Sequence, residues 1–339
     1  MPDFRYNRTA LVYLLPFVLL IISLFIGRYQ TPVSSVMDES IKIFSSLFFG
    51  TPASVSTQHT VLFNIRLPRI LAALLVGAAL STAGVSFQGI FRNPLVSPDI
   101  LGVGAGASFG ACLAMLLWNS YLFIQLMAFT FGLLAMFTAV IMSKASKGTG
   151  TLVFVLSGII VGSIFTALTS LVKYVADPYD QLPAIVFWLM GSLGTVRYVD
   201  IIWIILPMFI GTLLLFLLRW RINVLSLGDE EAKALGMNVE KMRLVVIVCA
   251  TLVTSAAVSI SGVIGWVGLV VPHISRMIVG PNYSRLLPMS MVIGASFMLL
   301  VDDLSRTIAA TEIPLGILTS LVGAPLFAYL ITKGRTGWN

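Results

Sequence analysis

Residues 201–218 read I-I-W-I-I-L-P-M-F-I-G-T-L-L-L-F-L-L and contain no charged side chain. A helix of about 17–25 apolar residues is long enough to cross the hydrocarbon core of a bilayer. Similar uncharged runs occupy residues 11–27 and 122–142. Backbone amides in lipid must be satisfied internally, and continuous apolar runs favour helices over barrel strands. The sequence therefore predicts an all-α polytopic membrane protein.

The whole chain is apolar enough for about ten transmembrane helices in a single domain, residues 1–339. Hydrophobic residues make up 58% of it and charged residues 10%, against about 25% charged residues in soluble domains. The predicted spans are residues 10–28, 61–87, 100–118, 121–142, 151–175, 200–218, 243–261, 264–272, 287–302 and 313–332.

The basic residues indicate topology. An even number of spans places both termini on one side, together with fourteen of the 21 basic residues: Arg5, Arg8, Arg92, Lys144, Lys147, Arg219, Arg221, Lys233, Lys241, Arg243, Arg276, Arg285, Lys333 and Arg335. The remaining seven lie on or near the other side. Cytoplasmic loops carry the excess of Lys and Arg, so we predict cytoplasmic termini. The net charge of +7 is then explained by the basic residues of cytoplasmic loops and does not predict a nucleic-acid partner.

Residues 225–237, L-S-L-G-D-E-E-A-K-A-L-G-M, form a polar segment between two hydrophobic halves. Three consecutive acids are flanked by leucines and bracketed by two glycines, as in a short amphipathic element with defined ends. The charge count places this segment in the cytoplasm, where it is predicted to contact a soluble partner. The residues assigned to this surface are Leu227, Gly228, Asp229, Glu230, Glu231, Ala232, Leu235 and Gly236.

Small residues and helix breakers follow one another along the chain. Gly106 with Gly110, and Gly158 with Gly162, have the spacing that lets membrane helices approach closely. Residues 261–272 contain three glycines and a proline, and Gly323 and Pro325 interrupt the last hydrophobic run. Broken helices at membrane depth are tolerated where protein or a water-filled cavity satisfies the backbone. These breaks favour a translocation path over a simple anchor.

Charged residues near predicted outer span ends have two explanations. Arg66 and Arg69 share one helix face, and Arg306 follows Asp302 and Asp303. Charges near the membrane are costly, so these groups either snorkel and pair with one another or meet acidic groups on a soluble protein outside.

The residues predict no catalytic centre of this chain's own. The phosphate-loop pattern G-x-x-x-x-G-K-[ST] is absent, so any ATP must be bound by another subunit. No metal-spaced Cys/His cluster occurs, and Cys112 and Cys249 both fall in apolar spans. We expect no cofactor or metal in this chain.

Eight motifs in order resemble one family: R-L-P-R (66–69), G-A-A-L-S-T-A-G (77–84), R-N-P-L-V-S-P-D-I-L-G (92–102), F-W-L-M-G-S-L-G (187–194), L-G-D-E-E-A-K-A-L-G (227–236), G-W-V-G-L-V-V-P-H-I-S-R (265–276), E-I-P-L-G (312–316) and G-A-P-L-F (323–327). They are similar to the permease subunits of the ABC importers for iron–siderophores, haem and cobalamin. The ordered set covers roughly residues 60–335 and is specific.

This resemblance implies a type II ABC importer permease fold in the cell (plasma or inner) membrane. The implied partners are a second copy of the chain, two cytoplasmic ATPase subunits that bind ATP and Mg, and an extracytoplasmic substrate-binding protein. Residues 225–237 would be the coupling segment for the ATPase. Arg66, Arg69 and Arg306 match arginines that dock the binding protein. The path would be lined by Gly158, Gly162, Thr166, Leu315, Thr319 and Val322.

The transported cargo and the class of protein each have alternative interpretations. S-P-D-I-L-G favours an iron–siderophore chelate, while cobalamin, haem or an oxyanion uses the same scaffold. An ion-coupled secondary transporter would also use broken helices, but it expects ionisable groups deep in the bundle. An intramembrane enzyme is disfavoured because the residues show no catalytic constellation.

Overall fold

The structure, a computed structural model, describes residues 3–29, 56–118, 120–146 and 151–332, with a few positions between 32 and 41. Every regular element in these ranges is a helix. The long helices are α1 (Asp3–Phe25), α4 (Leu67–Phe91), α5 (Val103–Leu117), α6 (Tyr121–Ala145), α7 (Thr151–Val175), α9 (Tyr198–Leu225), α11 (Val239–Ser261), α12 (Val267–Val279), α13 (Tyr283–Ser305) and α14 (Leu315–Thr332).

These helices coincide with the predicted spans, which confirms the all-α polytopic class. Six helical stretches of the described residues are long and apolar enough to cross a bilayer, and shorter apolar stretches lie in α1, α5, α12 and α14. Short elements link them: α3 (Thr57–His59), the π-helix Thr60–Arg66, the 3-10 helix Pro98–Leu101, α8 (Gln181–Leu189) and α10 (Asp229–Ala234). The sequence did not predict α8, because nine residues are too few for a span.

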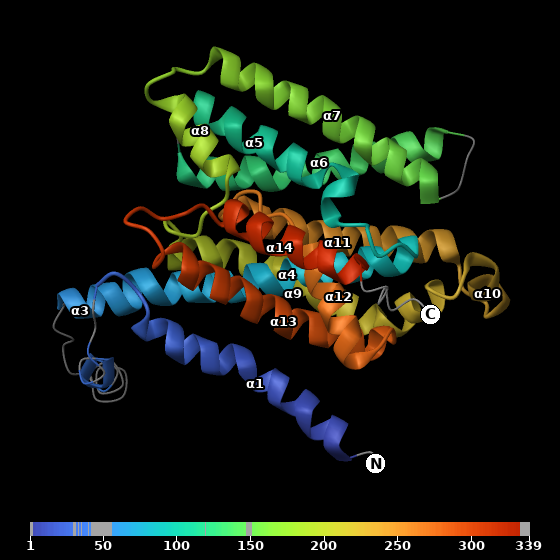
Figure 1. Ribbon diagram of the computed structural model, residues 1–339. Helices are drawn as coiled ribbons and strands as arrows, with labels where there is room; N and C mark the ends of the chain where they lie inside the picture. The colour runs from blue at the N-terminus through green and yellow to red at the C-terminus, as the bar shows by residue number, and fades with distance from the viewer. Residues whose placement is uncertain are drawn as a thin grey trace.

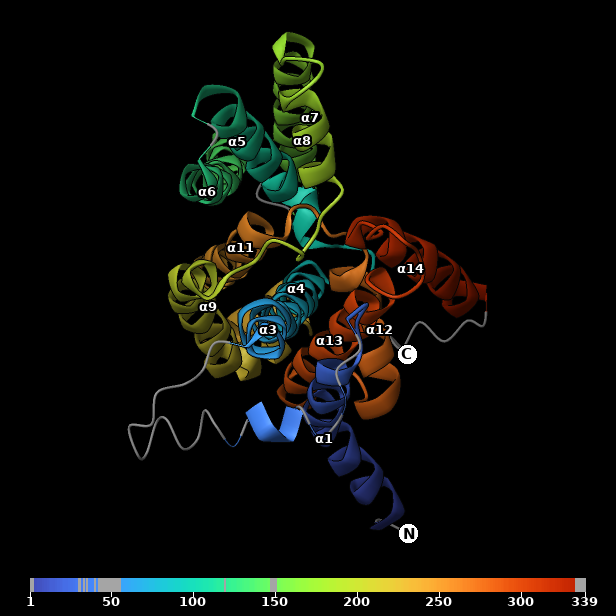
Figure 2. The same ribbon diagram turned by 90° about the vertical axis from the view of Figure 1, so that its left-hand side faces the viewer.

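Helices α5–α8 lie beside a larger group made of α4, α9 and α11–α14, and α1 runs along the outer edge of that group (Figure 1). Viewed end-on, α4 lies near the middle of the larger group, with α9, α11, α12 and α13 around it (Figure 2). One end of the bundle carries α10, and the start of α1 and the end of α14 lie toward the same end (Figure 1). We call this the α10 end.

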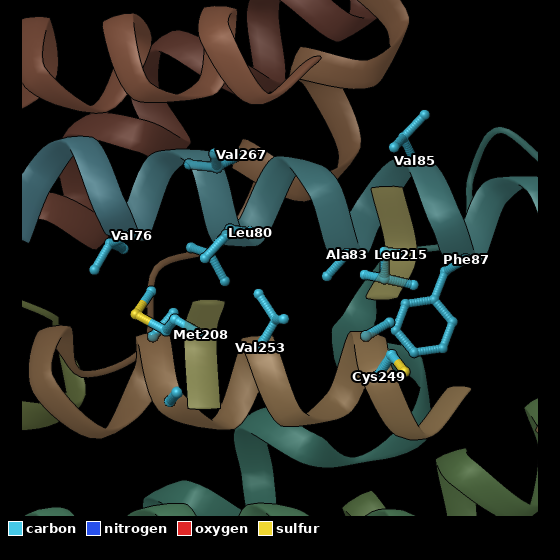
Figure 3. Packing of buried hydrophobic residues seen from close by; sticks show 14 of the residues in the cluster. Val76, Leu80, Ala83, Val85, Phe87, Met208, Leu215, Cys249, Val253 and Val267 are labelled. Carbon is cyan, nitrogen blue, oxygen red and sulfur yellow. The ribbon is translucent and has the colours of Figure 1, made fainter. Parts of the chain in front are cut away.

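The core forms between α4 and α11. Val76, Leu80 and Ala83 of α4 lie against Val253 and Cys249 of α11 (Figure 3), and all five are buried. Burial of these side chains within the bundle, away from lipid, depends on dense packing more than on hydrophobicity, since lipid tails are equally apolar.

Glycines bring α4 against its neighbours. A Cβ at Gly77 would lie 2.2 Å from the carbonyl oxygen of Gly294 on α13. A Cβ at Gly84 would lie 1.9 Å from the carbonyl oxygen of Gly268 on α12. Only glycine allows these backbones to touch, as expected for helix interfaces rich in small residues.

One predicted helix break is present and the other is not. The chain leaves the helix between α11 and α12, where Gly262 and Trp266 have φ of 67° and 70°. The carbonyl of Ser261 accepts from the Ser192 amide at 2.8 Å, so protein satisfies the freed backbone. The predicted interruption at residues 323–325 is wrong, since α14 continues through Pro325. Similarly, Pro272 does not end its span, because α12 runs on to Val279.

Candidate translocation path and docking surfaces

A cavity of about 690 Å³ runs along one face of α7. Three of the predicted path residues, Gly158, Gly162 and Thr166, line it. The other lining residues come from α7, from the segment around the start of α5 and, in the case of Val263, from the connection between α11 and α12: Asp99, Ile100, Gly102, Gly104, Ala105, Ser108, Ile159, Ser163, Ala167, Ser170 and Val263. The cavity is therefore walled mainly by small and hydroxylated side chains.

The hydroxyl groups of this wall have a common orientation. Ser108, Ser163, Thr166 and Ser170 each donate a hydrogen bond to the carbonyl four residues earlier, at 2.8–3.0 Å. Since each hydrogen is used within its own helix, the oxygen remains as an acceptor. The carboxylate of Asp99 adds acceptors, and the described lining contains no Lys or Arg. The wall is rich in hydrogen-bond acceptors.

The predicted path residues on α14 lie elsewhere. Leu315 and Thr319 are buried, whereas Val322 is exposed, and none of the three lines the α7 cavity. The start of α14 is held by the loop after α8, because Leu315 and Gly316 donate backbone hydrogen bonds to Gly191 and Met190. This structure therefore brings together the α7 half of the predicted path but not the α14 half.

The predicted polar segment contains a helix with the expected ends. Helix α10 (Asp229–Ala234) is preceded by Gly228 and followed by Gly236, with φ of 153° and 78°. A side chain at Gly228 would be strained by its positive φ, so this position favours glycine. Acids in the first turn of α10 are also favourable at a helix N-terminus.

One side of the α10 segment packs against the bundle, and the other side is exposed. Ala232 is fully buried, and Asp229 accepts from Arg243 of α11 at 2.8 Å. Leu227 and Leu235 are 63% and 67% exposed. Lys233 donates to Glu230 at 3.0 Å, and this hydrogen bond raises the pKa of Lys233. Two exposed leucines flanking a charged helix form a surface suited to a partner.

The arginines predicted for docking are buried at the end opposite α10. Arg69 pairs with Asp302 at 2.8 Å and with Glu312 at 2.8 Å. Arg306 pairs with Asp303 and donates to Ser23 of α1. Mutual pairing, one of the two explanations from the sequence, is therefore present. We call Ser23, Arg69, Asp302, Asp303, Arg306 and Glu312 the buried ion cluster.

Arg66 is held by backbone carbonyls. Its guanidinium donates to the carbonyl of Leu24 at 2.7 Å and to that of Tyr29, and it is only 4% exposed. The arginine thus ties the end of α1 to the start of α4. An exposed cation at this end is Arg197, whose side chain is 64% exposed.

Two features of these sites were missed by sequence reasoning. Asp99 lies directly before the predicted span 100–118 and was given no role, although it follows Pro98 at a glycine-rich helix start, which is the only local signal. The Asp229–Arg243 pair joins residues on different helices. No sequence spacing marks such a contact.

Comparison with known proteins assigns the family. The sequence model of the FecCD transport family matches residues 14–333. The molybdate import system permease protein MolB of Haemophilus influenzae is 42% identical over 322 residues, covering 94% of this chain and 93% of the relative. A probable iron chelatin transport system permease protein of Helicobacter pylori is 42% identical, covering 83% and 85%.

Other matches agree in class. The hemin transport system permease protein HmuU of Yersinia pestis is 38% identical, covering 86% of this chain and 89% of the relative. A solved structure described as an inward-facing conformation of a putative metal-chelate type ABC transporter superposes with a TM-score of 0.85 and 41% identity. It covers 98% of this chain and 100% of its own.

Proposed function

Because this chain belongs to the FecCD transport family of ABC importer permeases, we propose that it carries an iron–siderophore-type chelate across the inner membrane. An external binding protein delivers the chelate, and two ATPase subunits supply the energy. The chain is a multi-pass membrane subunit and not itself the enzyme of the complex. The observation that supports the cargo is the acceptor-rich cavity of about 690 Å³ along α7.

The chemistry of this wall favours a chelate over an oxyanion. An oxyanion such as molybdate offers acceptor oxygens and negative charge, and both are repelled by a carboxylate and by hydroxyl oxygens. A chelate with N–H and O–H donors, or with a net positive charge, finds complementary groups there. Cobalamin and haem remain alternative cargoes of the same class.

Reconstituted transport tests the cargo. The permease, its ATPase and its binding protein in proteoliposomes should accumulate a radiolabelled ferric hydroxamate chelate and not molybdate. Uptake of molybdate alone would remove the cargo proposal and leave the permease class intact. Asp99→Asn should lower uptake of a positively charged chelate more than that of a neutral one. Asp177→Asn, an exposed aspartate outside the cavity, is the matched control.

We propose that the α10 segment couples the permease to the ATPase. ATP binding can drive the permease only if the ATP-bound partner has different affinities for the two permease conformations. The exposed Leu227 and Leu235 would bind in a groove of the ATPase, while the Asp229–Arg243 pair transmits its movement to α11.

Two variants test this coupling. Leu227→Asp with Leu235→Asp should abolish co-purification of the ATPase without unfolding the permease, because both side chains are exposed. Leu304→Asp, at an exposed leucine of the opposite end, is the control. Gly228→Pro with Glu230→Lys should uncouple ATP hydrolysis from uptake. Normal transport by that variant would remove the coupling assignment.

The opposite end is proposed to dock the binding protein through Arg66, Arg69 and Arg306. Arg66→Glu with Arg69→Glu should weaken docking in a pull-down. Because these arginines are buried, Asp302→Ala is the control that disturbs the buried ion cluster without removing an arginine. Loss of docking in the arginine variant alone supports a direct role, and unchanged docking in it contradicts one.

The remaining proposals concern assembly and orientation. Two copies of the chain would enclose the path, with the α7 cavity facing the partner copy and both termini in the cytoplasm. Light scattering of the purified permease should report a dimer. A cysteine replacing the exposed Lys233 should react with an impermeant thiol reagent only from the cytoplasmic side.

A further inference from the structure

A second cavity, of about 560 Å³, lies at the α10 end of the bundle, away from the α7 cavity. The end of α6, the first turn of α7 and the start of α11 surround it. Its described lining residues are Ser143, Lys144, Ser146, Phe154, Asn238, Glu240, Lys241, Arg243 and Leu244. The proposed translocation path uses none of these residues.

The cavity contains an excess of positive charge. Lys144, Lys241 and Arg243 line it, against one acid, Glu240. Asp229 already offsets Arg243 through their ion pair at 2.8 Å. One positive charge therefore remains in the cavity, carried by the exposed lysines.

A buried donor of the wall also lacks a partner. The Arg243 side chain is 5% exposed and uses Nη2 for both oxygens of Asp229, at 2.8 and 3.0 Å. Its Nε has no hydrogen-bond partner within the described part of the chain. Leaving a buried N–H unsatisfied is costly, so a ligand with acceptor oxygens would complete the donor set of Arg243.

Apolar surface continues from the same cavity. Phe154 and Leu244 line it, and Ile141, three residues before the lining Lys144 and so on the same side of α6, is 67% exposed. Cations beside exposed apolar helix surface at one end of a transmembrane bundle suit a molecule with an anionic head and hydrocarbon chains. Basic pockets between membrane helices bind lipid headgroups in this way.

We propose that this cavity binds the phosphate headgroup of an anionic phospholipid. Lys144 and Lys241 contact the phosphate, the hydroxyl of Ser143 adds a polar contact, and the acyl chains lie along α6 and α7. Since Arg243 both lines the cavity and holds Asp229, lipid binding would act on the first residue of α10. This site does not depend on the identity of the cargo, and it shares Arg243 with the ion pair of the proposed coupling role.

Native mass spectrometry of the full chain in detergent tests the proposal. Wild-type protein should retain phosphatidylglycerol in preference to phosphatidylcholine. Lys144→Gln with Lys241→Gln should reduce that preference by roughly fivefold for each lysine, from about 1 kcal/mol per basic residue at an anionic lipid surface. The matched control is Arg221→Gln with Arg285→Gln, which removes two exposed cations at the same end, outside the cavity.

Three outcomes would overturn the proposal. The first is an undiminished lipid preference in the lysine variant, or an equal loss in the control. The second is displacement of phosphatidylglycerol by inorganic phosphate alone, which would identify a free anion as the ligand. The third is loss of ATPase co-purification by the lysine variant while its retention of phosphatidylglycerol is unchanged, which would identify a protein contact at the cavity. Elution of both variants as the wild-type species on size exclusion verifies folding.

Discussion

Helices α4 and α7 are equally long, 25 residues each, and both contain several glycine and serine residues, yet they have opposite environments. Of the most apolar window in the helical stretch that contains α4, 78% is buried inside the protein. The corresponding share for α7 is 22%. Small residues allow α4 to pack closely against its neighbouring helices, whereas in α7 they border a cavity. A small residue in a membrane helix can serve close packing or border a cavity, and the neighbouring helix decides which.

The difference is visible at single glycines. A Cβ at Gly84 of α4 would collide with a backbone oxygen at 1.9 Å, whereas a Cβ at Gly162 of α7 would find its nearest atom at 3.5 Å. Gly158 of α7 resembles the α4 glycines, with a backbone oxygen at 2.1 Å. Both α7 glycines line the cavity, but Gly158 also packs against backbone, whereas Gly162, about one turn later, does not.

Removal of the charge that anchors α4 should have the largest effect. Asp302→Ala leaves Arg69 without one of its carboxylates and should lower the free energy of unfolding by roughly 3–5 kcal/mol, as for other broken buried pairs. Thermal or denaturant unfolding in detergent measures this change. The exposed Lys233–Glu230 pair is the control, since Glu230→Gln should leave the melting temperature unchanged. Equal effects of the two substitutions would show that burial does not matter here.

Gly84→Ala should have the next largest effect. The added methyl group meets backbone and no flexible side chain, so α4 and α12 must separate, at a cost of about 1–3 kcal/mol. The same unfolding measurement applies. A variant as stable as wild type would contradict the close approach of these two helices.

Gly162→Ala should be neutral or stabilising by up to about 1 kcal/mol, because alanine is the better helix former and finds room. Gly162→Trp should instead fill the cavity and block uptake in proteoliposomes while the protein still folds. If Gly162→Ala is as damaging as Gly84→Ala, the cavity along α7 is closed in the working protein.

The smallest effect is expected for Thr166→Val. The Thr166 hydroxyl donates only to Gly162 in its own helix, so unfolding should change by less than about 0.5 kcal/mol. Loss of the acceptor oxygen should raise the KM for the chelate and leave kcat unchanged, since the contact removed holds the chelate equally in the ground state and the transition state. Thr138→Val, which removes a similar intrahelical bond outside the cavity, is the transport control.

Much of the fold could be predicted, because each span carries its own signal. The predicted span at residues 151–175 coincides with α7, and the glycines at 228 and 236 bracket α10 as expected. Prolines were the weak point. Pro272 and Pro325 were read as interruptions, but both lie inside helices, where neighbouring helices can re-satisfy the freed carbonyl.

The candidate sites were less predictable. Gly158, Gly162 and Thr166 were assigned to the path by the family resemblance, and they line one cavity. Leu315 and Thr319 were assigned to it in the same way and are buried. The loop after α8 and the neighbouring helices decide which of these residues are covered, and a resemblance of short motifs contains no such information.

By itself, the sequence determined the membrane class, the helices, the position of α10 and the family, because hydrocarbon requires continuous apolar helices and motifs are local. Tertiary structure alone decided that Arg69 meets Asp302, 233 residues away, and that Gly84 packs while Gly162 borders a cavity. These outcomes depend on which backbones approach one another. That approach is set by the packing of the whole bundle and by no single segment.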